Sequence, residues 1–224
     1  MTVRHIRWLL FTVLPILLVL DFLTSPRVVG MFQEWSNDQY RFAGGTGPVG
    51  LAISAIVFGL YLLLMFANPA VLGLPFPGVF RRFVAFSMDF VIAMTMMAPV
   101  LGIIVALIEW RKTGVFQWAF ERGTRTPEDG TLATAGTALM AVALAFYYAF
   151  PLVRRRPSPG ACIAGYQVIA DDGTTMTLRT ALLRTCVGFI SLCVAYLALF
   201  VARDRKRGKF WLDKVFGTRA VTWH

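Results

Sequence analysis

Apolar residues gather into five blocks along the chain, and polar, charged or proline-containing loops separate these blocks. The blocks cover residues 8–23, 49–66, 83–108, 132–153 and 181–202. A helix of about 20 apolar residues crosses the hydrocarbon core of a bilayer, so each block is a candidate membrane segment. Helices also satisfy their own backbone hydrogen bonds in lipid. The pattern therefore predicts an all-α transmembrane helical bundle with four to five membrane segments.

The first block follows a short basic start, as the apolar part of a signal peptide does. No small-residue cleavage site follows it, and we interpret it as an uncleaved anchor. After the second block, Pro69 and the Pro-Phe-Pro-Gly segment at 75–78 break the helical pattern. We therefore expect two parts: residues 1–77, an N-terminal pair of membrane helices with a linker, and residues 78–224, a membrane domain.

A short polar segment between the last two blocks carries a strand pattern. Residues 165–170 are typical of a strand, residues 171–173 (Asp-Asp-Gly) of a hairpin turn, and residues 174–178 of the return strand. The arginine cluster at 154–156 precedes this segment and is typical of a cytoplasmic loop. We predict a small cytoplasmic β-hairpin here, which needs support from helix ends or the membrane surface because isolated hairpins are marginal.

The fourth block carries a small residue at every fourth position. The stripe consists of Ala133, Thr137, Ala141, Ala145 and Ala149. Because small residues let membrane helices approach closely, we expect this face to pack against another helix of the bundle.

Composition supports the membrane class and indicates what surrounds the protein. Hydrophobic residues make up 57% of the 224 residues and charged residues 15%, whereas soluble domains are about half apolar and about a quarter charged. The net charge of +10 arises from basic residues in the loops, where they orient a membrane protein and attract anionic lipids. The expected partners are the lipid bilayer and anionic lipid headgroups, and no nucleic acid.

The sequence lacks the residue sets on which common enzyme sites are built. The two histidines, His5 and His224, lie near the chain ends, and no Ser/His/Asp set, Cys/His pair or phosphate-binding loop occurs. The three cysteines have no metal-ligand spacing. We therefore predict a non-enzymatic protein with no cofactor and no metal site.

Four charged residues are the candidate site. Arg82 and Asp89 are seven residues apart in or next to the third block, so they share one helix face at roughly 10 Å. That separation is too long for a direct bond, and each needs another partner. We expect Arg184, one turn into the fifth block, to pair with Asp89. Asp213, in the basic tail, is then the expected partner of Arg82.

Several short motifs follow one another in order over about residues 78–224. They are Arg82 with Ala85 and Asp89, the turn Ser158-Pro159-Gly160, the segment 165–173, Arg184, a basic cluster at 205–208, Asp213, Gly217-Thr218 and Val221. Together they resemble the RDD family of bacterial membrane proteins, which is named for one arginine and two aspartates. Ala161 departs from the family pattern, which usually has lysine there. The resemblance implies a multi-pass protein of the bacterial inner (cytoplasmic) membrane, with residues 78–224 as its RDD-like domain.

Two functions are compatible with these residues. The resemblance implies a membrane domain for which transport is often suggested, with sodium/proton exchange for some members. The first hypothesis is a transporter or transporter component, and its motive is the intramembrane carboxylate of Asp89. The alternative is a membrane accessory or assembly protein that binds a membrane-protein partner or a second copy of itself. The Arg/Asp set is then a structural clamp, because charges paired within a protein are costly to separate.

The distribution of basic residues leaves two topologies open. Five full crossings place 9 of the 22 lysines and arginines on the side of the N-terminus and 13 on the other. If the fifth block instead returns to the side it left, for example by bending at Gly188, the split becomes 16 to 6. The excess of basic residues in cytoplasmic loops favours the second arrangement, which places the C-terminal tail in the cytoplasm.

Overall fold

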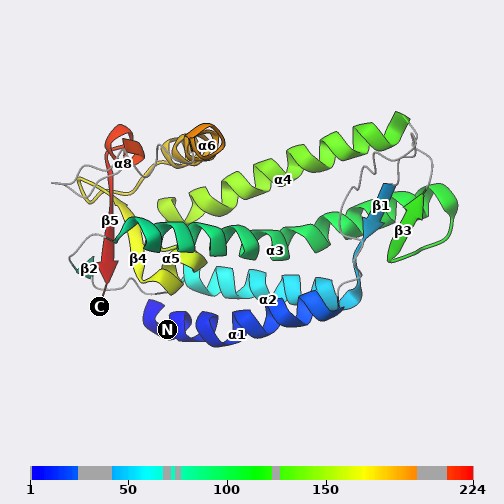
Figure 1. The fold of residues 1–224 in the computed structure, drawn as a ribbon, viewed down its shortest axis with the longest axis horizontal. Coiled ribbons are helices and arrows are strands. Elements are labelled where there is room, and N and C mark those ends of the chain that lie inside the picture. The colour runs from blue at the N-terminus through cyan, green and yellow to red at the C-terminus, as the bar shows by residue number, and fades with distance from the viewer. Residues whose placement is uncertain are drawn as a thin grey trace. The chain divides into compact units, whose positions relative to one another are not determined.

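The computed structural model describes residues 2–24, 42–67, 72–73, 77–122, 127–195 and 211–223. Its long helices are α1 (Val3–Thr24), α2 (Pro48–Met65), α3 (Val79–Thr113) and α4 (Pro127–Val153) (Figure 1). Each contains a stretch that is long and apolar enough to cross a membrane. The predicted transmembrane helical fold is therefore confirmed, with four candidate crossings among the described residues.

Further elements follow α4 or lie in the loops between the first four helices. After α4 come α5 (Pro159–Ala164), β4 (Tyr166–Ala170), α6 (Leu178–Ala195), α8 (Trp211–Val215) and β5 (Thr218–Trp223). The loops hold β1 (Phe42–Gly45), β2 (Leu72–Gly73) and β3 (Ala119–Arg122).

The chain forms two compact units. The first consists of residues 1–12, 60–92 and 144–224, and the second of residues 13–59 and 93–143. Each unit takes segments from both sides of residue 77. The expected division at residue 77 is a boundary along the sequence, whereas these units are defined by contacts in space. The units do not test that boundary, and it stays a prediction.

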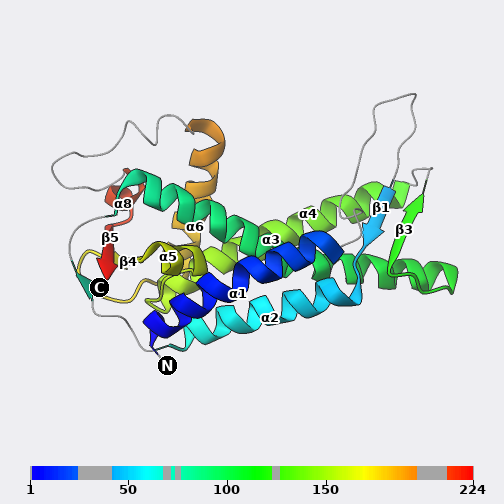
Figure 2. The same cartoon turned by 60° about the horizontal axis from the view of Figure 1, so that its bottom comes forward.

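A three-stranded antiparallel sheet in the first unit has the order β2-β5-β4 (Figure 1). Figure 2 shows β5 and β4 from a second direction. The predicted strand at 165–170 is confirmed as β4, but the predicted return strand at 174–178 is wrong. The strand that pairs with β4 is β5, in a register from Tyr166 opposite Thr222 to Ala170 opposite Thr218.

Side-chain hydrogen bonds explain why the expected return strand does not form. Asp172 accepts hydrogen bonds from the backbone nitrogen and the hydroxyl of Thr174, at 2.9 and 2.8 Å, which turns the chain away from β4. The hydroxyl of Thr177 accepts from the backbone nitrogen of Thr180 and so caps the start of α6. With residues 174–177 used in a turn and a helix cap, the free edge of β4 is left to the C-terminal segment.

The pairing of β5 with β4 decides between the two topologies. A backbone hydrogen-bond ladder cannot run across a bilayer, so residues 218–223 lie on the same side of the membrane as residues 166–170. The chain between these strands must return to the side it left. Five full crossings are therefore excluded, and the arrangement with the 16 to 6 distribution of basic residues applies. The course of residues 196–210 lies outside the described residues.

The second unit contains a two-stranded antiparallel ribbon of β1 and β3. The glycine-rich segment at 44–47 lies partly in this ribbon, because β1 ends at Gly45. A Cβ atom on Gly45 would collide with the backbone oxygen of Trp118, so the missing side chain permits this close pairing. The ribbon joins the loop after α1 to the loop after α3, which agrees with the expected alternation of sides.

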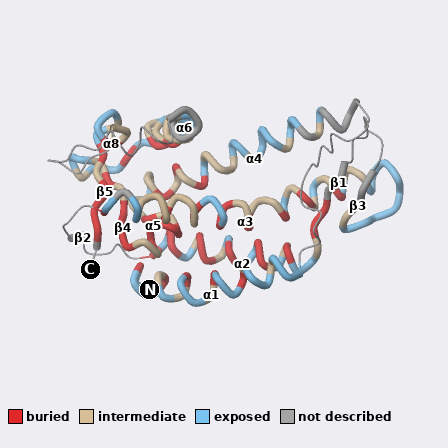
Figure 3. The backbone as a smooth tube through the Cα atoms, viewed as in Figure 1, coloured by how far each residue is buried: buried red, intermediate tan, exposed pale blue. Residues whose placement is uncertain are grey.

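The small-residue stripe on α4 is buried at one end only. Ala149 is buried and Ala145 half-buried, but Ala141 and Thr137 are exposed, and the side chain of Ala133 lies outside the described set. Figure 3 shows how burial decreases along α4 away from its C-terminal end. The expectation that the whole stripe packs against a helix is therefore wrong. Spacing alone identifies a face of a helix, but it does not show how far along that face a neighbour extends.

The topology can be tested with single cysteines placed at exposed positions of a cysteine-free variant. Val215, 63% exposed, lies at the end of α8, and Val115, 60% exposed, lies just after α3. In right-side-out membrane vesicles, an impermeant maleimide should label Val115→Cys directly and Val215→Cys only after permeabilisation. Labelling of both cysteines in sealed vesicles would contradict the returning fifth block.

Candidate functional site

The first half of α3 presents Arg82, Ala85 and Asp89 on one face, at spacings of three and seven residues. Ala85 packs in a cluster with Ala161 of α5 and Ala220 of β5. These methyl side chains let α5 and the sheet approach α3 closely. The face that carries the charged residues is therefore the face that the rest of the first unit covers.

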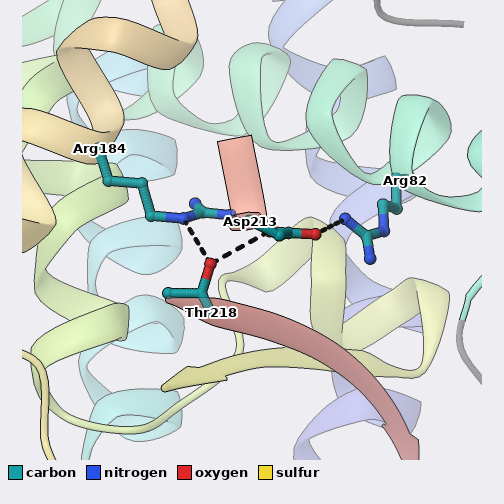
Figure 4. Close-up of polar contacts among 4 residues, drawn as sticks. All are labelled: Arg82, Arg184, Asp213 and Thr218. Atoms are coloured by element: carbon teal, nitrogen blue, oxygen red, sulfur yellow. Dashed lines mark hydrogen bonds and ion pairs between the residues drawn. The ribbon is translucent and has the colours of Figure 1, made fainter. Parts of the chain in front are cut away.

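Asp213 of α8 forms an ion pair with an arginine on each side (Figure 4). Its Oδ2 lies 2.6 Å from Nη1 of Arg82, and its Oδ1 lies 2.8 Å from Nη2 of Arg184. The hydroxyl of Thr218 donates to Oδ1 at 3.2 Å and accepts from Nε of Arg184 at 3.3 Å. We call these four residues the clamp.

The clamp is buried and holds its carboxylate ionised. The side chain of Asp213 is 1% exposed, and those of Arg82 and Arg184 are 15% and 13% exposed. Burial alone would raise the pKa of Asp213, but the charges of Arg82 and Arg184 and their hydrogen bonds outweigh it and lower the pKa below its usual range. The clamp therefore ties α3, α6 and α8 together by charge.

One of the two expected ion pairs is confirmed and the other is wrong. Arg82 pairs with Asp213 as predicted, but Arg184 also pairs with Asp213 and not with Asp89. The sequence places Arg184 and Asp89 at similar depths. It does not show that α8 would bring Asp213 between the two arginines.

Asp89 lies in a separate site and accepts hydrogen bonds from uncharged donors. The hydroxyl of Ser158 donates to Oδ2 at 2.5 Å, and the backbone nitrogen of Gly160 donates to Oδ1 at 2.7 Å. The hydroxyl of Tyr147, on α4, donates to Oδ1 at 3.0 Å. In the described part of the chain, this carboxylate is thus balanced by hydrogen bonds and not by a cation. Asp89 is 2% exposed.

The motif Ser158-Pro159-Gly160 forms the start of a helix, although the sequence suggests a turn. Ser158 is the N-cap of α5 in extended backbone, its hydroxyl accepts from the backbone nitrogen of Ala161 at 3.4 Å, and proline occupies the first helical position. Gly165 ends the helix with a left-handed conformation at φ +72°. The capping signals of α5 are all in the sequence, at 158, 159 and 165.

Tyr147 is a partner of Asp89 that the sequence does not indicate. Its ring stacks on that of Tyr61 at 5.0 Å between centroids, and the hydroxyl of Tyr61 donates to the backbone oxygen of Tyr147 at 3.0 Å. A tyrosine near the end of an apolar block is also typical of the membrane interface. Its role here follows only from the folded position of α4 in the first unit.

Comparison with known families assigns the chain to one of them. A family model, that of the RDD family, matches residues 76–217, which is more than half of the chain. The chain belongs to the RDD family. No curated protein and no solved structure matches it.

The RDD match begins before α3 and ends before β5, so it contains both carboxylates of the site. Arg82 and Asp213 belong to the clamp, and Asp89 belongs to the separate site with Ser158 and Gly160. The arginine and the two aspartates that carry the resemblance thus divide between two places in this RDD protein.

Removing the central charge of the clamp should destabilise the protein more than removing one of its arginines. Asp213→Asn removes the buried carboxylate with which both Arg82 and Arg184 pair, and we expect a loss of about 3–5 kcal/mol in the free energy of unfolding. Arg184→Gln leaves Asp213 paired with Arg82 and should cost less. SDS-titration unfolding measures both variants.

The pH dependence provides a second measurement on the same variants. Because the pKa of Asp213 is lower in the folded state, its contribution is present above the unfolded pKa of about 3.9 and is lost as the pH falls through the folded value. Acidification below about pH 4 should therefore destabilise the wild type more than Asp213→Asn. Equal acid sensitivity of the two proteins would contradict the clamp.

Gly160 should tolerate no side chain. A Cβ atom there would collide with the backbone oxygen of Ala85 and lie 2.8 Å from Cγ of Asp89. Gly160→Ala should displace α5 and destabilise the protein by about 1–3 kcal/mol or more. Gly59→Ala on α2 is the control, because a Cβ there meets nothing within 4 Å and alanine favours a helix. Equal stability of the two variants would show that α5 is not held closely against α3.

Proposed function

We propose that this RDD protein is a non-enzymatic membrane transport protein, or a component of one, in which Asp89 is the carboxylate that binds the transported proton or cation. One observation carries the proposal: an ionisable side chain lies buried in a candidate membrane-crossing helix, and its described partners are uncharged. Ionisable residues at membrane depth are costly and commonly mark ion pathways.

The hydrogen bonds around Asp89 are compatible with both protonation states. Hydroxyls both donate and accept, so those of Ser158 and Tyr147 can rotate when the carboxyl gains a proton of its own. An arginine in contact with Asp89 would hold it ionised. Since Arg82 and Arg184 are bound to Asp213, that objection to a proton-carrying role does not apply.

The clamp has a structural role in this proposal. Its positive and negative charges satisfy one another at 2.6 and 2.8 Å, and its carboxylate is almost fully buried. It would fix α6 and the C-terminal segment against α3 while Asp89 changes its state. The family-type residues Arg82, Arg184 and Asp213 are thus assigned to stability, and Asp89 to ion binding.

The alternative is an accessory or assembly protein, and the geometry of Asp89 gives it specific support. Two donors to Asp89, Ser158 and Gly160, lie at the start of α5. The carboxylate would then act as a latch that holds α5 on α3. On this reading the Arg/Asp set has no ion to carry, and the protein would act through a membrane-protein partner or a second copy of itself.

The resemblance and the charge distribution support a location in the bacterial inner membrane. The side that carries 16 of the 22 lysines and arginines would be cytoplasmic. In this orientation α5, the sheet and the clamp would lie at the cytoplasmic surface.

Cation flux through the purified protein in liposomes tests the proposal. A pH gradient is imposed, sodium or potassium is added outside, and an enclosed pH-sensitive dye reports dissipation. Wild-type protein should dissipate the gradient, and Asp89→Asn should fall to the rate of protein-free liposomes. The amide oxygen of the substituted side chain still accepts hydrogen bonds, so we expect this variant to fold, and thermal unfolding in detergent checks it.

Asp172→Asn is the matched control, since Asp172 is exposed and its amide replacement still accepts from Thr174. It should keep wild-type flux. If the wild type shows no flux above protein-free liposomes with either cation, transport by this chain alone is contradicted. A wild type without flux, together with an Asp89→Asn variant of lower thermal stability, would favour the latch.

A further inference from the structure

Two arginines from different helices converge above Gly165, away from the clamp. A Cβ atom on Gly165 would lie 2.9 Å from Nη2 of Arg81 and 3.5 Å from Nη2 of Arg7. Both distances are measured from the same Cβ position, so the two Nη2 atoms are no further apart than the sum of the two distances. That sum is shorter than the Debye length of about 8 Å at physiological salt, and the two positive charges repel each other.

These two arginines have few partners among the described residues. Nε of Arg7 donates to the backbone oxygen of Ile163 at 3.1 Å, which orients its guanidinium and leaves the two Nη atoms available. Neither arginine forms an ion pair in the described part of the chain, whereas the neighbouring Arg82 binds Asp213. Arg81 is exposed and Arg7 half-buried, so a ligand can reach both.

Both arginines lie near the starts of helices that carry membrane-crossing stretches, where we expect the headgroups of a bilayer. Arg7 is in the first turns of α1, and Arg81 is near the start of α3, two helices with membrane-crossing stretches. An exposed aromatic residue stands next to each in the sequence: Trp8 is 65% exposed and Phe80 is 77% exposed. Aromatic residues are typical of the interface between headgroups and acyl chains.

We propose that Arg7 and Arg81 form a binding site for a phosphate group, namely that of an anionic phospholipid. Guanidinium groups present planar, paired donors that match the oxygens of a phosphate, and basic pockets between membrane helices bind anionic headgroups. The bound phosphate offsets the repulsion between the two arginines, and the acyl chains lie along the exposed aromatic side chains.

The missing side chain of Gly165 leaves the space that this site occupies. It ends α5 in the left-handed conformation, and an added Cβ would meet the Arg81 guanidinium at less than ordinary van der Waals distance. The carbonyl of Ile163 thus positions Arg7, and the missing side chain of Gly165 leaves space for the guanidinium of Arg81. The site belongs to the fold of the first unit and is not a chance gathering of surface charge.

Native mass spectrometry of the full-length protein in detergent tests the site. Phosphatidylglycerol and phosphatidylcholine are titrated separately, and the bound fractions give apparent dissociation constants. Phosphatidylglycerol should bind the wild type more tightly. Each of Arg7→Gln and Arg81→Gln should weaken its binding about fivefold, and the double variant about 25-fold. Arg111→Gln, an exposed arginine in the last turn of α3, is the control for net charge and should change little.

Three outcomes overturn the proposal. The first is a double variant that binds phosphatidylglycerol as the wild type does, and the second is an Arg111→Gln variant that weakens binding equally. The third is displacement of phosphatidylglycerol by millimolar inorganic phosphate, together with phosphatidylcholine binding as tightly as phosphatidylglycerol. These two results would assign the site to free phosphate. Arg81→Gln alone keeps the test decisive if Arg7→Gln impairs folding, because Arg81 is exposed and its replacement by glutamine removes no ion pair within the described residues.

Discussion

The C-terminal half of this RDD protein depends on one carboxylate, that of Asp213, between the guanidiniums of Arg82 and Arg184. A buried carboxylate is costly without a counter-charge, and so are buried guanidiniums without a carboxylate. The three side chains come from α3, α6 and α8, so the charges are paired only when these helices come together. Thr218, which bonds to both Asp213 and Arg184, is also the first residue of β5. The charge interaction therefore places the strand that completes the sheet, and the sheet fixes the side of the membrane on which the chain ends.

The two aspartates, Asp89 on α3 and Asp213 on α8, are stabilised by different kinds of partner. Asp213 has cations on both sides, and its pKa is held below the usual range although it is buried. Asp89 accepts hydrogen bonds from two hydroxyls and a backbone N–H group. These donors stabilise the charged carboxylate, but they do not hold it in the charged state, because a hydroxyl can also accept a hydrogen bond from a protonated carboxyl. A full ion pair suits a permanent joint between helices. A carboxylate among neutral donors suits a group that gains and loses a positive ligand. This contrast is the physical reason to separate the clamp from the proposed ion site.

The sequence predicted the features that depend on composition and local pattern. Apolar blocks indicated the crossing helices, the basic loops favoured a returning fifth block, and the seven-residue spacing put Arg82 and Asp89 on one face and out of reach of each other. It did not predict which strand pairs with β4, because Asp172 and Thr177 divert residues 174–177 and the true partner, β5, lies about 50 residues further on. The partner of Arg184 and the role of Tyr147 depend on where α8 and α4 lie after folding. Periodicity reports which face of an element is covered, but not by what.

Small residues determine how closely the elements of the first unit approach one another. They thereby determine the surroundings of its charged side chains. Gly160 lets α5 approach α3 closely enough for its backbone nitrogen to reach Asp89 at 2.7 Å. At the other end of the same helix, Gly165 leaves the space in which the Arg81 guanidinium lies beside Arg7. A six-residue helix thus contacts the buried carboxylate at one end and the two converging arginines at the other. A movement of α5 would change the hydrogen bonds of Asp89 and the spacing of the two arginines together. If both proposals hold, the binding of an anionic lipid and the state of Asp89 are coupled through this helix, because neither end can shift without the other.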